Sequence, residues 1–309
     1  MMSNLSFWFC IRVSNVKFDV EHLQTLLAVV DAGSFDDASI DLGITASAVS
    51  QRIKALENRL GAVLVVRSRP VVPTEQGIKV LRYARQIAAL SAEFSYEISL
   101  TGHQQIAVGV NADSLSTWFT PVFDELARWT DVSVEILRMD ESRSLDTLRS
   151  GRVSAVVTNS SVAVQGCTVR KLGALRYRAA CTPGMAREHF ARGSSDGFLT
   201  APMMIFDRED RLQHHLLEQL GLDPGQRHGA VHMVPDSWQF LRAIQAGMGW
   251  GMVPEQQLAQ VHGLEELDDR WFIDVPLYFQ RWSVDSEILG RLESTLLQVA
   301  SESGLDLLT

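Results

Sequence analysis

Apolar and polar residues follow a helical period between Ser34 and Leu60. A rotation of about 100° per residue gathers the apolar side chains into one narrow stripe, formed by Val49, Ile53, Leu56 and Leu60. The opposite side carries Ser47, Gln51, Lys54 and Asn58. One face is therefore suited to a core, and the other, with short hydrogen-bonding groups and a cation, is suited to the major groove of DNA. The alternative is an ordinary helical hairpin with a solvated face.

Start and stop signals divide this stretch into two helices. Ser34 followed three residues later by Asp37 is similar to a capping box, and Gly43 ends a short helix that begins near Phe35. Thr45 can cap the next helix. Two short helices joined by a glycine-containing turn predict a helix-turn-helix.

The flanking segments complete a small DNA-binding domain. An earlier helix begins at Asp19 and ends at Gly33, because apolar residues recur at Leu23, Leu26, Leu27 and Val30. After the second helix, Val63–Val66 and Val71–Val72 form short β-type runs. The residues between these runs are Arg67, Ser68, Arg69 and Pro70. A hairpin with a basic tip is typical of a wing, with a solvated turn as the alternative.

A long helix is expected next. Thr74 caps a helical stretch that continues to Ser99, a length of about 39 Å at 1.5 Å per residue. Its apolar side is formed by Ile78, Leu81, Ala84 and Ala88. The polar residues Thr101–Gln105, which include Gly102, suit a hinge.

Beyond residue 105 the pattern changes to alternating strands and helices, which predicts parallel βαβ units. The first set comprises Ile106–Val110, Trp118–Arg128, Val132–Leu137, Ser144–Arg149 and Val153–Thr158. The second set has strands at Met203–Phe206, Val231–Val234 and Gly251–Val253, and helices at Asp210–Leu220, Asp236–Ala246 and Glu255–Val261. The chain is expected to cross between the sets near Tyr177–Cys181 and to return near Ile273–Phe279. Two α/β lobes joined by two crossovers predict a periplasmic-binding-protein-like clamp.

Composition is that of an ordinary globular chain of two or three domains. The 309 residues are 46% hydrophobic and 21% charged, and the net charge is −9. Between Thr45 and Leu90, however, eight arginine and lysine residues face only two glutamates, so this segment can engage phosphates. No apolar run is long enough to span a bilayer, and the three cysteines share no metal-like spacing. We expect a cytoplasmic protein without membrane association.

Catalytic, cofactor and metal motifs are weak throughout the chain. The glycine-rich stretch Gly247–Gly251 joins a helix to a strand, whereas a dinucleotide loop follows a strand and opens a helix. The histidines at 214, 215, 228 and 232 lack a cysteine or carboxylate cluster that would complete a ligand set. We therefore expect neither an enzyme nor a bound cofactor or metal.

A candidate ligand site lies at Asn111–Trp118, where a strand ends and a helix begins. Exposed backbone N–H groups there, with the hydroxyls of Ser114, Ser116 and Thr117, can hold a ligand carboxylate. Simple helix capping is the alternative, since it needs only one of those hydroxyls.

The ordered motifs from Ser34 to Gly77 resemble the winged helix-turn-helix of LysR-type transcriptional regulators. The matching positions are Ser34, Phe35, Ala38, Val49, Ser50, Ile53, Lys54, Leu56, Glu57, Leu60, Gly61, Arg67, Arg69, Thr74 and Gly77. The segments Asn111–Phe119, Phe206–Arg208 and Val275–Tyr278 are similar to the ArgP/LysG branch of this family, whose members sense lysine or arginine and control the export of basic amino acids. The resemblance covers nearly the whole chain after residue 17.

The resemblance implies a domain order. Residues 18–73 are expected to form the DNA-binding domain, 74–101 the linker helix and hinge, 102–178 with 276–309 effector lobe I, and 179–275 effector lobe II. Residues 1–17 are expected to be disordered or to reflect a mis-assigned start, with Val16 as the true first residue. The linker helix pairs with its mate in the family, so a homodimer or homotetramer is expected.

The resemblance also implies roles for individual residues. Ser47, Ser50 and Gln51 are expected to face base edges in double-stranded promoter DNA, and phosphates are expected to contact Arg52, Lys54, Arg67 and Arg69. Lysine or arginine would be held between the lobes. The residues expected to bind it are Asn111, Asp113, Ser114, Ser116, Thr117, Thr158, Asp207 and Ser237.

The expected outcome is activation of a basic amino acid exporter gene, with RNA polymerase as a further partner. Three alternatives stay open. The chain could be a LysR-type regulator with a different effector, an architectural or replication-origin-binding protein, or a small-molecule-binding protein or enzyme in which the N-terminal hairpin is incidental. A small molecule that changes promoter occupancy would separate the first two classes.

Overall fold

The computed structural model describes residues 19–99, 104–139, 141–190 and 195–305. Residue contacts divide the chain into two units, residues 1–89 and residues 90–309. The expectations for residues 1–17 lie outside the described residues, as do residues 101–103 of the expected hinge. The division between the units falls inside the long helix α4 (Glu75–Ser99).

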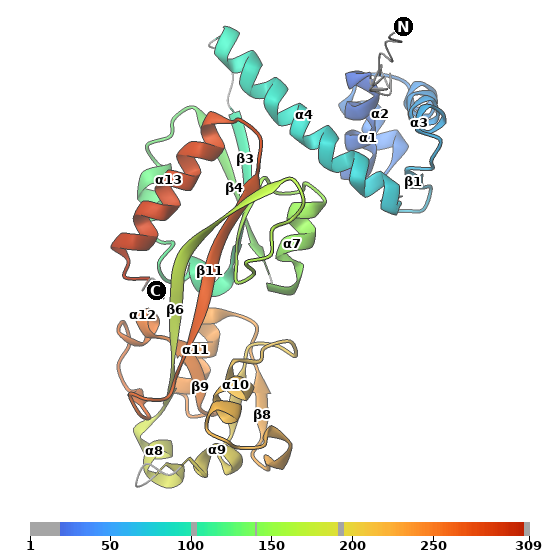
Figure 1. Ribbon diagram of the computed structural model, residues 1–309. Coiled ribbons are helices and arrows are strands. Elements are labelled where there is room, and N and C mark those ends of the chain that lie inside the picture. The colour runs from blue at the N-terminus through green and yellow to red at the C-terminus, as the bar shows by residue number, and fades with distance from the viewer. Residues whose placement is uncertain (1–18, 100–103, 140, 191–194, 306–309) are drawn as a thin grey trace, which may run out of the picture. The chain divides into compact units, whose positions relative to one another are not determined.

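In its described part, residues 19–89, the first unit contains three complete helices, a hairpin and the beginning of a fourth helix (Figure 1). The elements are α1 (Val20–Ala32), α2 (Phe35–Asp41), α3 (Ala46–Leu60), β1 (Val65–Val66), β2 (Val72–Pro73) and the beginning of α4. The expected caps are confirmed, because the side chains of Asp19, Ser34 and Thr45 each accept a backbone hydrogen bond from the first turn of the following helix. Gly33 ends α1 with a φ of 69°, a left-handed conformation that favours glycine.

The core of this unit lies between α1, α3 and the start of α4. Leu26, Val49, Ile53 and Leu56 are all fully buried, so the apolar stripe predicted for α3 does face the core. A Cβ atom at Gly77 would collide with the Leu64 carbonyl, so glycine lets the first turn of α4 pack closely against the wing. The hairpin and α4 are therefore tightly joined.

The second unit contains two lobes. Lobe I comprises β3 (Gln104–Asn111), α5 (Ala112–Leu115), α6 (Val122–Leu126), β4 (Val132–Met139), α7 (Glu141–Arg149), β5 (Ala155–Thr158) and α13 (Glu287–Glu302). Lobe II comprises α8 (Pro183–His189), α9 (Gly197–Thr200), β7 (Met203–Ile205), α10 (Leu212–Gln219), η2 (Pro224–Gln226), β8 (Val231–Met233), α11 (Ser237–Gln245), β9 (Gly251–Pro254), α12 (Glu255–Leu258) and β10 (Glu265–Glu266).

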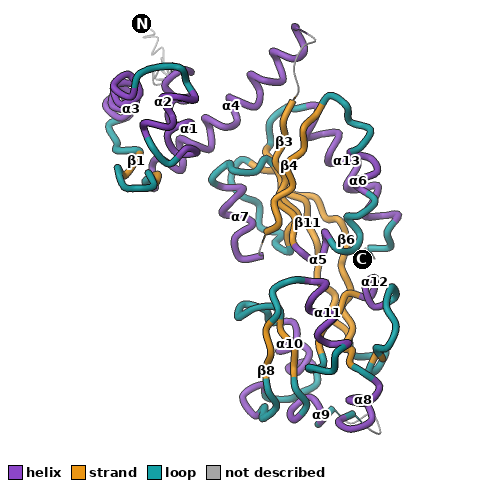
Figure 2. Tube along the Cα trace, turned by 180° about the vertical axis from the view of Figure 1, so that it is seen from behind, coloured by secondary structure: helices purple, strands orange, loops and turns teal. Residues whose placement is uncertain are grey.

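Two long strands belong to both lobes. They are β6 (Cys167–Cys181) and β11 (Phe272–Trp282), which pair antiparallel with each other and run from one lobe into the other (Figures 1 and 2). The segments expected as simple crossovers thus lie inside continuous strands, because backbone pairing continues through the connection. The pairing register shifts only between Leu277 and Tyr278.

A seven-stranded sheet is organised around this pair. Its order is β10, β6, β11, β5, β3, β4, and β9 also pairs with β6. β3 is parallel to β4 and β5, as the alternating pattern predicted, whereas β11 is antiparallel to β5. β7 and β8 form a separate parallel pair in lobe II. The helices α7 and α13 lie on either side of the lobe I sheet (Figures 1 and 2).

Several helices differ from the sequence prediction. The helix expected at 118–128 is reduced to α6, which begins after Pro121, since proline removes a backbone donor and starts rather than continues a helix. The preceding residues Trp118 and Phe119 are buried in turns. The helices expected at 210–220 and 255–261 are shortened to α10 and α12, and α8, α9 and α13 were not predicted.

Both lobes share one hydrophobic core. It extends from Trp118 and Phe119 in lobe I through Phe279 on β11 to Phe198 and Trp250 in lobe II. A smaller core beneath α11 contains Phe240, Leu241 and Ile244. In the described part of the chain, no helix combines the length with the apolar character needed to cross a membrane.

Candidate functional site

Helix α3, the second helix of the predicted helix-turn-helix and so its expected recognition helix, presents its polar side to solvent. Ser47, Gln51 and Lys54 are exposed, and Ser50 is half-buried. Because Val49 and Ile53 anchor the opposite side in the core, these four polar side chains keep a fixed orientation. The arrangement has the shape and chemistry of a helix that enters a major groove.

The wing is held in place at its base and exposed at its tip. The Thr74 hydroxyl donates to the Val63 carbonyl at 2.7 Å and accepts from the backbone N–H of Gly77 at 3.0 Å. Arg67 and Arg69 at the tip are exposed, and the Arg67 guanidinium lies 4.9 Å from the centre of the Phe35 ring. Both cations are therefore available to a phosphate backbone next to α3.

Arg52 differs from the other predicted phosphate contacts. Its guanidinium donates to a Glu21 carboxylate oxygen at 2.7 Å, and its side chain is only 30% exposed. The contact joins α3 to α1 within the first unit. A phosphate would have to compete with Glu21 for this guanidinium.

The apolar side of α4 predicted for self-association has another role. Leu81 and Ala84 are 2% and 1% exposed, because they pack into the core of the first unit. A different set of large apolar side chains on α4 is exposed, namely Tyr83, Leu90 and Phe94. Their spacing of seven and four residues places them on one face of the helix.

Three predicted effector residues meet at the boundary between the lobes. Ser237, the first residue of α11 in lobe II, donates its hydroxyl to an Asp113 carboxylate oxygen at 2.8 Å. Ser116, which follows α5 in lobe I, lies with its hydroxyl oxygen 3.0 Å from that of Ser237. A third contact between the lobes is the ion pair of Arg138 with Asp236 at 3.5 Å.

Two further residues of this cluster were not predicted. The Tyr177 hydroxyl donates to the second carboxylate oxygen of Asp113 at 2.7 Å, and the Gln257 amide donates to the Ser237 hydroxyl at 3.0 Å. Both side chains are buried. Sequence reasoning had placed Tyr177 in a crossover and Gln257 inside a helix, where their side-chain partners cannot be read from spacing.

Burial dominates the electrostatics of Asp113. It raises the pKa of the carboxyl, hydrogen bonds from Tyr177 and Ser237 lower the pKa, and the charge of Asp210 raises it again. The net pKa lies above the ordinary value of 3.8. An ionised Asp113 at this position would be stabilised by any cation placed beside it.

The remaining predicted residues of lobe I line the ends of its strands. Asn111 and Thr158 end the parallel strands β3 and β5, and the Thr158 hydroxyl lies 3.2 Å from that of Ser144. Thr117 donates its hydroxyl to the backbone carbonyl of Asp113 at 2.6 Å, so it caps its own turn. In contrast, the side-chain oxygens of Asn111 and Ser114 are buried without a hydrogen-bond partner.

Asp207 is not brought into the cluster by any hydrogen bond in the described structure. One of its carboxylate oxygens accepts from the backbone N–H groups of Glu209 and Asp210, so the residue organises its own loop. Asp210 also accepts backbone hydrogen bonds, from Phe206 and Leu212. Of the two carboxylates, Asp210 is the one whose charge reaches Asp113.

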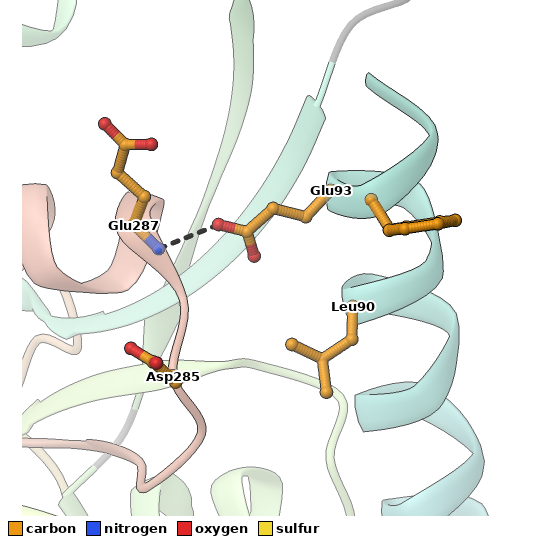
Figure 3. A pocket seen from close by; sticks show the side chains of 5 residues that line it. Leu90, Glu93, Asp285 and Glu287 are labelled. Atoms are coloured by element: carbon orange, nitrogen blue, oxygen red, sulfur yellow. Dashed lines mark hydrogen bonds between the residues drawn. The ribbon is translucent and has the colours of Figure 1, made fainter. Parts of the chain in front are cut away.

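A pocket of about 460 Å³ lies elsewhere in the second unit (Figure 3). It is lined by Leu90, Glu93, Phe94, Asp285 and Glu287. A Glu93 carboxylate oxygen accepts from the backbone N–H of Glu287 at 2.7 Å, at the start of α13. The pocket contains none of the predicted effector residues. Within the described ranges, no three histidine, cysteine or acidic side chains are grouped so that they could hold a metal ion.

Comparison with known proteins gives a consistent result along the chain. Residues 20–78 match the family described as bacterial regulatory helix-turn-helix protein, lysR family, and residues 101–281 match the LysR substrate binding domain. The chain is 40% identical over 283 residues to the lysine export transcriptional regulatory protein LysG of Corynebacterium efficiens, covering 90% of this chain and 97% of that protein.

Solved structures agree with this match. Full-length LysG from Corynebacterium glutamicum with bound effector Arg is 37% identical, with a TM-score of 0.79 over 92% of this chain and 99% of that chain. ArgP from Mycobacterium tuberculosis is 38% identical, with a TM-score of 0.86 over 94% of this chain and 99% of that chain. The predicted winged helix-turn-helix, linker helix and two-lobed α/β fold are confirmed, and the chain belongs to the LysR family of DNA-binding transcriptional regulators.

Proposed function

We propose that this regulator responds to a basic amino acid, lysine or arginine, bound between the two effector lobes. The observation that carries the proposal is the buried Asp113 carboxylate at the lobe boundary, in a chain 37% identical to a LysG structure that holds arginine. The relatives named for lysine export support the same ligand class. A basic amino acid carries the cation that such a carboxylate needs.

The two ends of the ligand would contact different side chains. Asp113 would accept hydrogen bonds from the side-chain cation, because a buried charge requires a paired counter-charge. The oxygens of Asn111 and Ser114, which are buried without a hydrogen-bond partner, are candidates for contacts with the α-amino and α-carboxylate groups of the ligand. Ser116, Thr158 and Ser237 would complete the wall of the site, whereas Thr117 and Asp207 would shape it through their backbone contacts.

The output of the protein would be transcription of a gene for basic amino acid export. Ser47, Ser50 and Gln51 would read bases, and Lys54, Arg67 and Arg69 would bind phosphates, with Arg52 available only if it leaves Glu21. Effector binding would alter how paired DNA-binding domains engage the promoter. The protein would work in the cytoplasm, as a homodimer or homotetramer that contacts RNA polymerase and carries out no catalysis.

Calorimetric titration of the full chain tests the effector. We expect lysine or arginine to bind the wild type more tightly than norleucine, which has a similar stem and no side-chain cation. Asp113→Asn should weaken binding of the basic amino acid several times more than binding of norleucine. Asp124→Asn is the matched control, because it removes an exposed carboxylate on α6 of lobe I that takes no part in the cluster. Equal binding of lysine, arginine and norleucine would refute the proposal.

A further inference from the structure

The hydroxyl groups around Asp113 have a defined hydrogen-bond direction. The Ser237 oxygen carries one proton, and the closest acceptor is Asp113 at 2.8 Å, compared with 3.4 Å to the Gln257 side-chain oxygen. The same oxygen accepts from the Gln257 amide and can accept from Ser116, both at 3.0 Å. The Ser237 hydroxyl thus donates to Asp113, accepts from Gln257, and has the Ser116 hydroxyl within hydrogen-bond distance of its second acceptor position.

Asp113 receives a donor on each of its two oxygens. Tyr177 donates to one at 2.7 Å and Ser237 to the other at 2.8 Å. A neutral carboxylic acid has only one good acceptor oxygen, whereas a carboxylate has two, so this pair of donors favours the ionised form. Each oxygen keeps a further lone pair, which leaves acceptor capacity for an incoming cation.

Tyr177 is the donor with the more rigid support. It is 3% exposed and lies on β6, where it pairs with Ile273 of β11 and with Pro254 of β9. Ser237 instead lies at the start of α11 and belongs to lobe II alone. Tyr177 lies on the strand that both lobes share, with neighbouring strands on both sides.

We propose that Tyr177 is the positioning residue for the effector's cation: it holds Asp113 in its ionised form and in a fixed orientation, and so sets the preference for basic over neutral amino acids. This inference rests on the proposed function. The charge of Asp210 acts against the ionised form of Asp113. Arg138 and Asp236 also lie at the lobe boundary, where they pair with each other.

A purely structural role for Tyr177 predicts a different result. Its ring is part of the shared core, so a packing role would persist in phenylalanine and affect all ligands alike. Loss of the hydroxyl alone removes a hydrogen bond to a charged group. Such bonds are worth enough to change binding by about tenfold or more.

The test compares Tyr177→Phe with the wild type by titration calorimetry, using arginine, lysine and norleucine at a series of pH values. We expect the affinity for the basic amino acids to fall about tenfold and the affinity for norleucine to stay within about twofold. The pH below which arginine binding weakens should also move upward, since removing the donor raises the pKa of Asp113 further. Tyr83→Phe is the control, because it removes a hydroxyl on α4 that accepts from Arg82.

Three outcomes are informative. An unchanged ratio of arginine to norleucine affinity, or an unchanged pH profile in a Tyr177→Phe protein that unfolds at the wild-type temperature, would overturn the inference. If Tyr177→Phe unfolds at a lower temperature than the wild type, the pH midpoint of its remaining arginine binding still tests the inference, and a midpoint equal to that of the wild type overturns it. Tyr177→His and Tyr177→Trp are not substitutes for this comparison. Failure of the wild type to bind any basic amino acid would instead reject the proposed function.

Discussion

At the scale of single residues, the structure brings the predicted residues Asp113, Ser116 and Ser237 into one hydrogen-bonded cluster, and it adds two residues that were not predicted. Asp113 comes shortly after a strand, and Ser237 is the first residue of a helix, directly after its cap. At such positions polar side chains meet at the edge of a sheet. Tyr177 and Gln257 come from elements whose side-chain directions depend on tertiary packing. A periodic pattern reports which residues are buried, and it does not report which buried hydroxyl faces which carboxylate.

The raised pKa of Asp113 gives a pH prediction. The pKa of the Asp113 carboxyl is higher in the folded protein than the ordinary value of 3.8, so the folded chain holds the proton more tightly. The contribution of this carboxyl to stability therefore falls as the pH rises through the window from 3.8 to the raised pKa. A cation beside Asp113 instead favours the ionised carboxylate over the protonated carboxyl. We expect arginine binding to weaken as pH falls below the raised pKa, by at most about tenfold per pH unit.

The measurement is a series of arginine titrations from about pH 8 to about pH 5, within the range where most globular proteins remain folded. Thermal unfolding of the ligand-free protein across the same range is the control, since it separates loss of binding from loss of structure. A dissociation constant for arginine that falls as the pH is lowered would contradict the role given to Asp113.

At the scale of elements, helix ends were predicted correctly where a neighbouring side chain or glycine caps the helix. The N-caps at Asp19, Ser34 and Thr45 and the glycine at the end of α1 were all confirmed. The predicted helix at 118–128 was wrong because its apolar residues serve turns that are buried on several sides. Hydrophobic spacing alone cannot distinguish a buried turn from a buried helix.

The recognition helix and the wing give a paired prediction about DNA. Gln51→Ala should cost about 1–3 kcal/mol of binding and relax the preference at one base position, because an exposed amide on α3 can read a base edge. Arg69→Ala should weaken binding to all sequences and reduce the salt slope by about one, as expected for a phosphate contact.

Fluorescence anisotropy on an operator and on single-base variants, at several salt concentrations, measures both effects. Arg187→Ala is a suitable control, since it removes an exposed cation from lobe II. If Gln51→Ala keeps both the affinity and the sequence preference of the wild type, the assignment of α3 to base reading is wrong.

At the scale of the whole molecule, the order of elements was predictable and their continuity was not. Alternating strands and helices correctly indicated two α/β lobes. The pairing of β6 with β11 joins residues about a hundred positions apart, and such long-range pairing leaves no local trace in the sequence. The same limit explains why the apolar residues of α4 were assigned to a partner chain when Leu81 and Ala84 belong to the domain core.

The exposed stripe on α4 gives a prediction about assembly. Tyr83, Leu90 and Phe94 are 54%, 37% and 62% exposed, and a helix with such a stripe is stabilised by pairing with a second copy. We expect Phe94→Glu to shift the protein toward the monomer in light scattering at micromolar concentration. Val162→Glu, which changes an exposed apolar residue outside α4, should leave the mass unchanged. A wild type that is monomeric at that concentration would disprove self-association through α4.

Because glycine at position 77 lets the first turn of α4 pack directly on the wing, the beginning of that helix is part of the DNA-binding domain itself. Any side chain at this position would meet the Leu64 carbonyl and push the hairpin away from α4. The tip of the wing, with Arg67 and Arg69, would then shift relative to α3. A residue with no side chain thus sets the spacing between the two parts of the domain that have to fit the same stretch of duplex DNA.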